Sequence, residues 1–255
     1  MSERTIEEPA TMQYRTDRFG PLDCTIVDAF TRTGHPRLAV ILAHGYGAPG
    51  DDLVPLAAHL LHDEDVREGV RFVFPHGPIA LRHIPGGRAW WDLDVEQLIA
   101  AVETGTFDDF RQHVPQHLPL ARSCFDDFVR ALGTAWRLRP QQLVVGGFSQ
   151  GSMLATDWAL HAEENVAGLC IWSGTLLCEE EWGRWARRHA GLAVFQSHGR
   201  FDPLLPFDAA VRLRDLLQAA GLAVDFLAFD GEHTIPEAAV DGLLRLIRAA
   251  LEQDV

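Results

Sequence analysis

The feature that most constrains this chain is a repeated alternation of apolar, β-rich runs with amphipathic stretches. The β-rich runs are Cys24–Ala29, Leu38–His44, Val70–Phe74, Leu143–Phe148, Val166–Trp172, Leu192–His198 and Val224–Phe229. Helical spacing, with apolar residues three and four positions apart, occupies Leu53–Leu61, Phe125–Trp136, Met153–His161, Phe207–Ala220 and Ile235–Leu251. Because strands that alternate with helices pair in parallel, this pattern predicts an α/β fold, with a mostly parallel central sheet and helices on both faces.

The chain has no composition shift that divides it, so we expect a single domain over residues 1–255. Residues 1–13 are polar and acidic and lack the apolar core of a secretion signal, which predicts a loose N-terminal tail. The region 93–125 is the least regular and predicts an insertion of loop and short helix. The most apolar stretch, Leu38–Ala43, is far below the roughly 20 residues of a membrane-spanning helix, so no membrane span is expected.

The net charge limits the kinds of partner that the chain can bind, and the cysteine spacing indicates the cellular compartment. The formal net charge is -14, from 36 acidic and 22 basic side chains, which argues against nucleic acid and anionic membranes and favours a small neutral or cationic substrate. The four cysteines, Cys24, Cys124, Cys170 and Cys178, lie far apart without C-x-x-C spacing, which is typical of reduced thiols in a cytoplasmic protein. Exposed apolar patches could support a homodimer, although no feature of the sequence demands one.

Unusual residues follow four of the predicted strands. In open parallel sheets, ligands bind beyond the carboxyl ends of the strands. The segments at these ends are HGYGAPG from His44, GFSQG from Gly147, HGRFDP from His198 and DGEH from Asp230. We therefore expect four pieces of one site at the same edge of the sheet.

The segment Gly147-x-Ser149-x-Gly151 matches the nucleophile-elbow pattern, in which a strained turn from strand to helix exposes a serine oxygen above the sheet. A strand pattern precedes it and a helical pattern follows it, as the motif requires. The helix N-terminus also favours negative charge that develops next to the serine. The alternative is a serine in an ordinary glycine-rich turn.

A serine hydroxyl needs a base to take its proton, and the base needs a third group to orient it. After the elbow, histidines occur at His161, His189, His198 and His233. His161 and His189 fall in helical, polar contexts, which predicts solvated surface residues. His198 precedes the candidate acid, which inverts the expected order of nucleophile, acid and histidine. His233 follows the last predicted strand and is the predicted base, the alternative being a structural loop histidine.

Three aspartates compete for the role of the orienting acid. Asp202 lies in the loop after a predicted strand, where the acid is expected. Asp208 begins a helix after Pro206 and is better explained as a carboxylate of the first turn. Asp230 is three residues from His233 on the same loop and would have to fold back on it. Asp202 is therefore the predicted acid.

Acyl transfer also needs hydrogen-bond donors for the oxyanion of the tetrahedral intermediate. The backbone N–H of Gln150, directly after the serine, is the first predicted donor. The N–H of Tyr46, between two glycines that let the backbone approach a substrate, is the second. The alternative for the segment around Tyr46 is a simple Gly/Pro turn before the next helix.

Taken together, these segments resemble the phospholipase/carboxylesterase family of α/β-hydrolases, which includes acyl-protein thioesterases and small bacterial carboxylesterases. The similar segments, in family order, are HGYGAPGDDL (His44–Leu53), GGRAWWDLD (Gly86–Asp94), GGFSQGSMLA (Gly146–Ala155), SHGRFDPLLPF (Ser197–Phe207) and GEHTIP (Gly231–Pro236). The resemblance implies an α/β-hydrolase fold and the hydrolysis of short- to medium-chain acyl esters or thioesters, without a metal ion or an organic cofactor.

The resemblance also implies roles for individual residues. It assigns Ser149, Asp202 and His233 to a catalytic triad and Tyr46 and Gln150 to the oxyanion hole.

Two further features concern the substrate. Trp90 and Trp91 resemble a segment that the family places beside the acyl pocket, the alternative being two aromatic rings packed in the core. The region 93–125 is longer than the family pattern, and an insertion there could act as a cap over the substrate.

Other classes of protein fit the sequence less well. A metal enzyme is disfavoured because the chain has no H-E-x-x-H motif, and Pro115 interrupts the spacing between His113 and His117. A non-catalytic binding protein on the same fold typically lacks a member of the triad. Within the enzymes, a lysophospholipase or a dienelactone-type hydrolase is the alternative, although the latter usually carries cysteine at the elbow.

Overall fold

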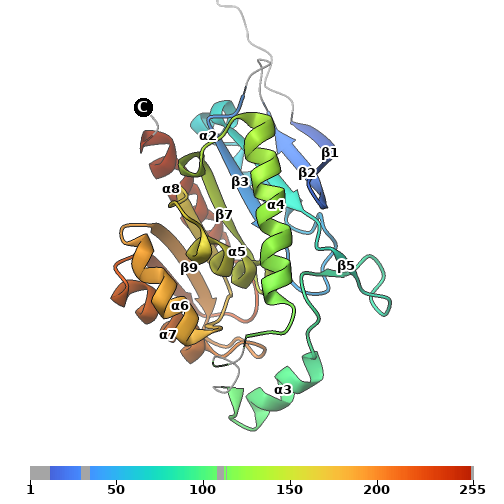
Figure 1. The fold of residues 1–255 in the computed structure, drawn as a ribbon, viewed down its shortest axis with the longest axis vertical. Coiled ribbons are helices and arrows are strands. Elements are labelled where there is room, and N and C mark those ends of the chain that lie inside the picture. Colours follow the sequence, from blue (N-terminus) through green and yellow to red (C-terminus); the bar gives the residue numbers. More distant parts are fainter. Residues whose placement is uncertain (1–11, 30–34, 108–111, 113, 254–255) are drawn as a thin grey trace, which may run out of the picture.

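The computed structural model of the chain describes residues 12–29, 35–107, 112 and 114–253. Its centre is an eight-stranded sheet with the strand order β1-β2-β4-β3-β7-β8-β9-β10 (Figure 1). The strands are β1 Gln13–Phe19, β2 Leu22–Asp28, β3 Leu38–Ala43, β4 Val70–Pro75, β7 Leu143–Phe148, β8 Gly168–Trp172, β9 Ala193–Gly199 and β10 Ala223–Phe229. Strand β2 is antiparallel to both of its neighbours, and all other pairs are parallel. The predicted α/β fold with a mostly parallel sheet is confirmed.

Helices cover both faces of this sheet. One face packs against α4 Leu118–Trp136, α5 Gln150–His161, α6 Glu179–Ala186 and α7 Phe207–Ala219. The other face packs against α1 Val54–Leu60, α2 Glu64–Gly69 and α8 Glu237–Gln253. Strand β3 is buried along its whole length, with Ala39 and Ile41 in one core and Leu38, Val40 and Leu42 in the other. Burial on both faces explains why the central strands read as continuous apolar runs.

Strand β1 departs from the prediction. No strand was predicted here, and Gln13, which was assigned to the tail over residues 1–13, already pairs with Asp28 of β2. Residues 1–11 of the predicted tail lie outside the described residues. The sequence QYRTDRF has little apolar character because β1 is an edge strand that is mostly exposed, so backbone hydrogen bonds to β2 and the buried ring of Phe19 hold it.

The irregular region 93–125 also differs from the prediction at its end. It contains α3 Val95–Glu103, which begins where the Asp94 carboxylate accepts a hydrogen bond from the Gln97 N–H. Helix α4, however, begins at Leu118 and not at Phe125. Proline is tolerated in the first turn of a helix, so the Pro-containing segment before Phe125 continues into the helix instead of breaking it.

Helix α3 and a small hairpin flank the end of the sheet at which most strands finish. In Figure 1, α3 projects beyond the lower end of α4, away from the other helices. The hairpin consists of β5 Ile79–Ala80 and β6 Arg88–Ala89, and it is joined to the loop after β3 by the hydrogen bond from Gly47 N to Arg88 O (2.9 Å). Within the described ranges, no helix is long and apolar enough to cross a membrane.

Candidate active site

Ser149 lies in a strained turn between β7 and α5. Its backbone has φ 52° and ψ −119°, a conformation that residues other than glycine rarely adopt. A Cβ atom on Gly147 or on Gly151 would collide with the Ala43 carbonyl oxygen of β3. The two glycines therefore let the turn close against the neighbouring strand, and this close approach is the physical content of the G-x-S-x-G pattern.

The loops after β9 and β10 bring Asp202 and His233 together. The Nδ1 atom of His233 lies 2.6 Å from Oδ2 of Asp202. Two backbone hydrogen bonds join the loops, from Arg200 N to Phe229 O (2.9 Å) and from Phe201 N to Gly231 O (3.0 Å). The parallel pairing of β9 with β10 places both loops at one edge of the sheet, so residues 31 positions apart meet there.

The Asp202 carboxylate is buried and surrounded by donors. Its Oδ1 atom accepts hydrogen bonds from the backbone N–H groups of Leu204 and Leu205, both at 2.9 Å. Burial alone would raise the pKa of this carboxyl, but hydrogen bonds from His198 and His233 outweigh burial and hold the pKa well below its usual range. Asp202 is therefore ionised at neutral pH and can accept a hydrogen bond from the Nδ1–H of His233.

The competing aspartates lie elsewhere. Asp208 occupies the first turn of α7, as predicted. Asp230 has a side chain that is 80% exposed and pairs with Arg200, whose Nε lies 3.3 Å from Oδ1. Both positions have a local explanation that does not involve His233.

The two predicted oxyanion donors line the same cavity as Ser149 and His233. Gln150 is the first residue of α5, so its N–H has no partner within the helix. The Gly47 N–H is engaged by the Arg88 carbonyl, whereas the Tyr46 N–H has no hydrogen-bond partner in the described part of the chain. Both N–H groups are thus available to an oxygen atom of a ligand.

The cavity has a volume of about 840 Å³ and is largely apolar. Its apolar lining includes Trp91, Leu98, Phe107, Phe148, Met153 and Leu177. Residues of α3 and of the segment 93–107 around it, together with Pro115 and Gln116, form one of its walls. A volume of this size is in the upper range for small-molecule sites, which run from roughly 300 to 1,000 Å³.

A family model described as phospholipase/carboxylesterase matches residues 30–251 of the chain. The chain belongs to this family. Among its relatives, the acyl-protein thioesterase 1 of Eremothecium gossypii is 26% identical over 229 residues, which cover 86% of this chain and 90% of the relative. The acyl-protein thioesterase 1 of Candida albicans is 22% identical over 229 residues, which cover 85% and 94%.

Solved structures show the same fold for this phospholipase/carboxylesterase family member. The crystal structure of esterase PE8 superimposes with a TM-score of 0.71 at 24% identity, covering 88% of this chain and 96% of that one. A carboxylesterase from Mesorhizobium loti gives a TM-score of 0.69 at 15% identity, covering 92% and 98%. The α/β-hydrolase fold inferred from the sequence is thereby confirmed.

In this family member, the two adjacent tryptophans have different environments. Trp91 lines the cavity, as predicted for a substrate contact. Trp90 does not line it: its indole N–H donates to the His44 carbonyl (2.9 Å) and its ring packs edge-on against Phe125. Both tryptophans are 2% exposed and belong to the same hydrophobic core, but only Trp91 reaches the cavity, so Trp90 matches the alternative of an aromatic ring packed in the core.

The side chain of Gln150 and the ring of His44 support the site, and neither role was predicted. The Gln150 amide accepts a hydrogen bond from Trp90 N (2.9 Å) and donates one to Trp91 O (2.8 Å). The Nε2 atom of His44 accepts a hydrogen bond from Gly77 N, and its Nδ1 atom contacts the Gly45 carbonyl oxygen. Burial lowers the pKa of His44 to about 4, so the ring is neutral and acts as a fixed brace for the loop after β3.

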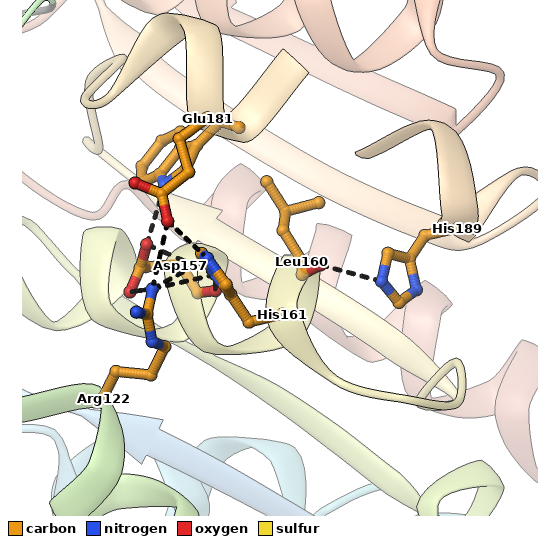
Figure 2. A network of polar contacts seen from close by, with 7 residues as sticks. Arg122, Asp157, Leu160, His161, Glu181 and His189 are labelled. Atoms are coloured by element: carbon orange, nitrogen blue, oxygen red, sulfur yellow. Dashed lines mark hydrogen bonds and ion pairs between the residues drawn. The ribbon is translucent and has the colours of Figure 1, made fainter. Parts of the chain in front are cut away.

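His161 and His189 are not solvated surface residues, contrary to the prediction. His189 is 1% exposed and its ring nitrogens contact Asn165 Oδ1 (2.7 Å) and Leu160 O (2.9 Å). The His161 side chain is 14% exposed and lies 2.8 Å from Glu181. Figure 2 shows that His161 belongs to a polar cluster between helices. Their polar sequence neighbours, such as Glu163 and Arg188, are exposed, but the two histidine rings themselves are enclosed and contact polar groups.

The described residues contain no group of three or more His, Cys, Asp or Glu side chains that could hold a metal ion. Of the two histidines considered for such a role, His113 lies outside the described residues, and His117 precedes α4, with its Nδ1 3.7 Å from Asp92. The four cysteines are free thiols, and three of them are buried.

Proposed function

We propose that this protein is a serine hydrolase that cleaves short- to medium-chain carboxylic esters or thioesters through an acyl-enzyme intermediate. Its family and its relatives support the esterase/thioesterase class of hydrolase. The observation that carries the proposal is that the strained Ser149 and His233, which is hydrogen-bonded to Asp202, line one apolar cavity. No simpler structural role accounts for all three at once.

In the proposed mechanism, the Ser149 oxygen attacks the acyl carbonyl while His233 takes its proton. Asp202 holds His233 through Nδ1 and stabilises the imidazolium that forms. The N–H groups of Tyr46 and Gln150 receive the oxyanion, and the dipole of α5 favours the same negative charge. The alcohol or thiol leaves with the proton from His233, and water then hydrolyses the acyl-enzyme by the same steps in reverse roles.

The wall of the cavity supports a second part of the proposal. We infer that the described residues of the predicted insertion 93–125 that precede α4, namely 93–107, 112 and 114–117, act as a cap within a single hydrolase domain and limit the length of the acyl group. Leu98 and Ala101 are the buried residues of α3, and both line the cavity. A cytoplasmic location and a homodimer stay predictions from the sequence.

Initial rates on p-nitrophenyl esters and matching thioesters of increasing acyl length test this function, with Ser149→Ala as the blank. The rate should peak at one acyl length and vanish in the blank, and a fluorophosphonate should label the peptide that contains Ser149. Rates in Ser149→Ala equal to those of wild type, or fluorophosphonate labelling of another residue, would contradict the proposed roles.

The charge of the cavity predicts a preference among substrates. Asp52, Asp92 and Asp94 line it, and no lysine or arginine does so among its described residues. A choline ester should therefore be cleaved with a higher kcat/KM than the uncharged 3,3-dimethylbutyl ester of the same acid, by about threefold per carboxylate at low salt. Asp92→Asn should reduce this ratio without changing the rate on the uncharged ester. Equal kcat/KM values for the two esters in wild type would show that the carboxylates do not select the leaving group.

A further inference from the structure

Asp202 contacts a second histidine besides His233. The Nε2 atom of His198 lies 3.3 Å from Oδ2 of Asp202, the same oxygen that His233 approaches to 2.6 Å. It also lies 2.8 Å from the carbonyl oxygen of Leu205. His198 belongs to β9 and its side chain is completely buried, so the sheet itself fixes its position.

The surroundings of His198 define its protonation. Both neighbours of Nε2 are hydrogen-bond acceptors, so Nε2 carries the proton and is shared between Asp202 and Leu205. The Nδ1 atom is buried and has no hydrogen-bond partner within the described structure. A buried nitrogen without a partner disfavours the fold, so packing alone does not explain an imidazole at this position.

We propose that His198 is a positioning residue for the Asp202–His233 pair, and that its Nε2–H shares the negative charge of Oδ2 with the Nδ1–H of His233. This inference rests on the function proposed above. Because two backbone N–H groups hold Oδ1, four donors enclose the carboxylate and orient it toward His233.

Charge sharing has a consequence for the base. The dipole of the His198 N–H offsets part of the negative potential that Asp202 exerts on His233. The imidazolium of His233 is then stabilised less than it would be by Asp202 alone, so activity should extend to a lower pH. Removing the donor should therefore move the acid limb of the pH–rate profile to higher pH.

The other titratable groups around this pair remain in place when His198 is changed. On the adjoining loops and α7 they are Arg200 with its partner Asp230, Asp208 and Glu232, and across the cavity they are Tyr46, Asp52, Asp92 and Asp94. A change in the pH profile can thus be assigned to the missing donor.

The test compares His198→Leu, which removes the donor, with His198→Gln, whose amide N–H can reach the position of Nε2. In His198→Leu we expect kcat to fall about tenfold, with KM near that of wild type because His198 does not line the cavity. The acid limb of kcat/KM should move to higher pH by about half a unit. His198→Gln should restore most of the rate and the original limb.

A second buried histidine provides a matched control. His189 is as buried as His198 and also makes two hydrogen bonds, one of them to the Leu160 carbonyl (Figure 2), but it does not contact Asp202. His189→Leu should lower stability without moving the acid limb. An unmoved limb in His198→Leu, or one that moves to lower pH, would overturn the inference.

Two further comparisons keep the outcomes distinct. If His198→Leu does not fold, His198→Asn replaces it, because the shorter amide cannot reach Asp202. If the acid limb of kcat/KM then lies at the same pH in the Asn and Gln variants, charge sharing is overturned. Ser149→Ala serves as the blank throughout. Activity that persists in that blank refutes the proposed function itself, whereas a Ser149-dependent enzyme with a normal His198→Leu profile refutes only the role of His198.

Discussion

Ser149→Ala is expected to lower kcat by about 10⁶-fold and to leave the fold intact. The alanine side chain has no oxygen to attack the acyl carbonyl, and residual catalysis comes only from the oxyanion donors and from substrate binding. Initial rates on the preferred ester, together with a circular dichroism spectrum, measure both parts. A folded variant that keeps more than about one per cent of the wild-type kcat would remove Ser149 from the mechanism.

Ser149→Gly separates the catalytic role of this residue from its backbone strain. The φ of 52° and ψ of −119° are unfavourable for serine and alanine but accessible to glycine. Both variants should be inactive, yet the glycine variant should be more stable than the alanine variant by about 1 kcal/mol in urea unfolding. Ala135→Gly in α4 is the control, because glycine at an ordinary helical position should cost about 1 kcal/mol. A glycine variant less stable than Ser149→Ala would show that the turn is not strained.

The largest effect on stability is expected for Arg122→Ala. Arg122 of α4 lies 3.0 Å from the Asp157 carboxylate of α5, whose side chain is 1% exposed. Asp157 also accepts a hydrogen bond from the indole of Trp182 in α6 (2.8 Å). Figure 2 shows Glu181 and His161 completing this cluster. Arg122 thus neutralises a buried charge where three helices meet.

Without Arg122, the Asp157 carboxylate stays buried but loses its guanidinium partner, and we expect a loss of about 3–5 kcal/mol in the free energy of unfolding at pH 8. Arg130→Ala is the control on the same helix. Arg130 pairs with Asp126 at 2.7 Å, but its side chain is 72% exposed, so its loss should cost less than about 0.5 kcal/mol. Equal losses for the two variants would show that burial does not set the strength of this interaction.

The pH dependence of that loss has a defined sign. Burial raises the pKa of the Asp157 carboxyl, while Arg122 opposes the rise. Removing Arg122 raises the pKa further, so the folded variant takes up a proton more readily than the unfolded chain. The penalty is complete above the raised pKa and shrinks as pH falls through it. The stability difference from wild type should therefore be smaller at pH 5 than at pH 8.

Much of the fold can be predicted from short segments of the sequence. Strands β3, β7 and β8 are buried on both faces, so their burial requires apolar residues at every position, and such runs are visible in any sequence. Strand β1 was missed for the opposite reason, since an exposed edge strand is held by its partner's backbone. Helices α2 and α6, with six and eight residues, were missed, whereas α3 is the short helix expected within region 93–125.

The same division applies to the candidate site. Chain position was enough to nominate Ser149, Asp202 and His233, because a parallel sheet brings the ends of its strands to one edge. Whether the side chains meet, which tryptophan faces the cavity and what surrounds the acid depend on residues far apart in sequence. His198 was set aside from its order in the chain, yet it lies 3.3 Å from Asp202.

By itself, the sequence determined the parallel sheet, the strained turn at Ser149 and the edge of the sheet where the candidate residues gather. These depend on burial periodicity and on glycines that permit close backbone approach, and both are properties of short segments. Only the tertiary structure decided that His161 and His189 are enclosed and that Asp157 is a buried charge. Polar side chains look alike in sequence whether water or a distant residue satisfies them, and packing alone selects between the two.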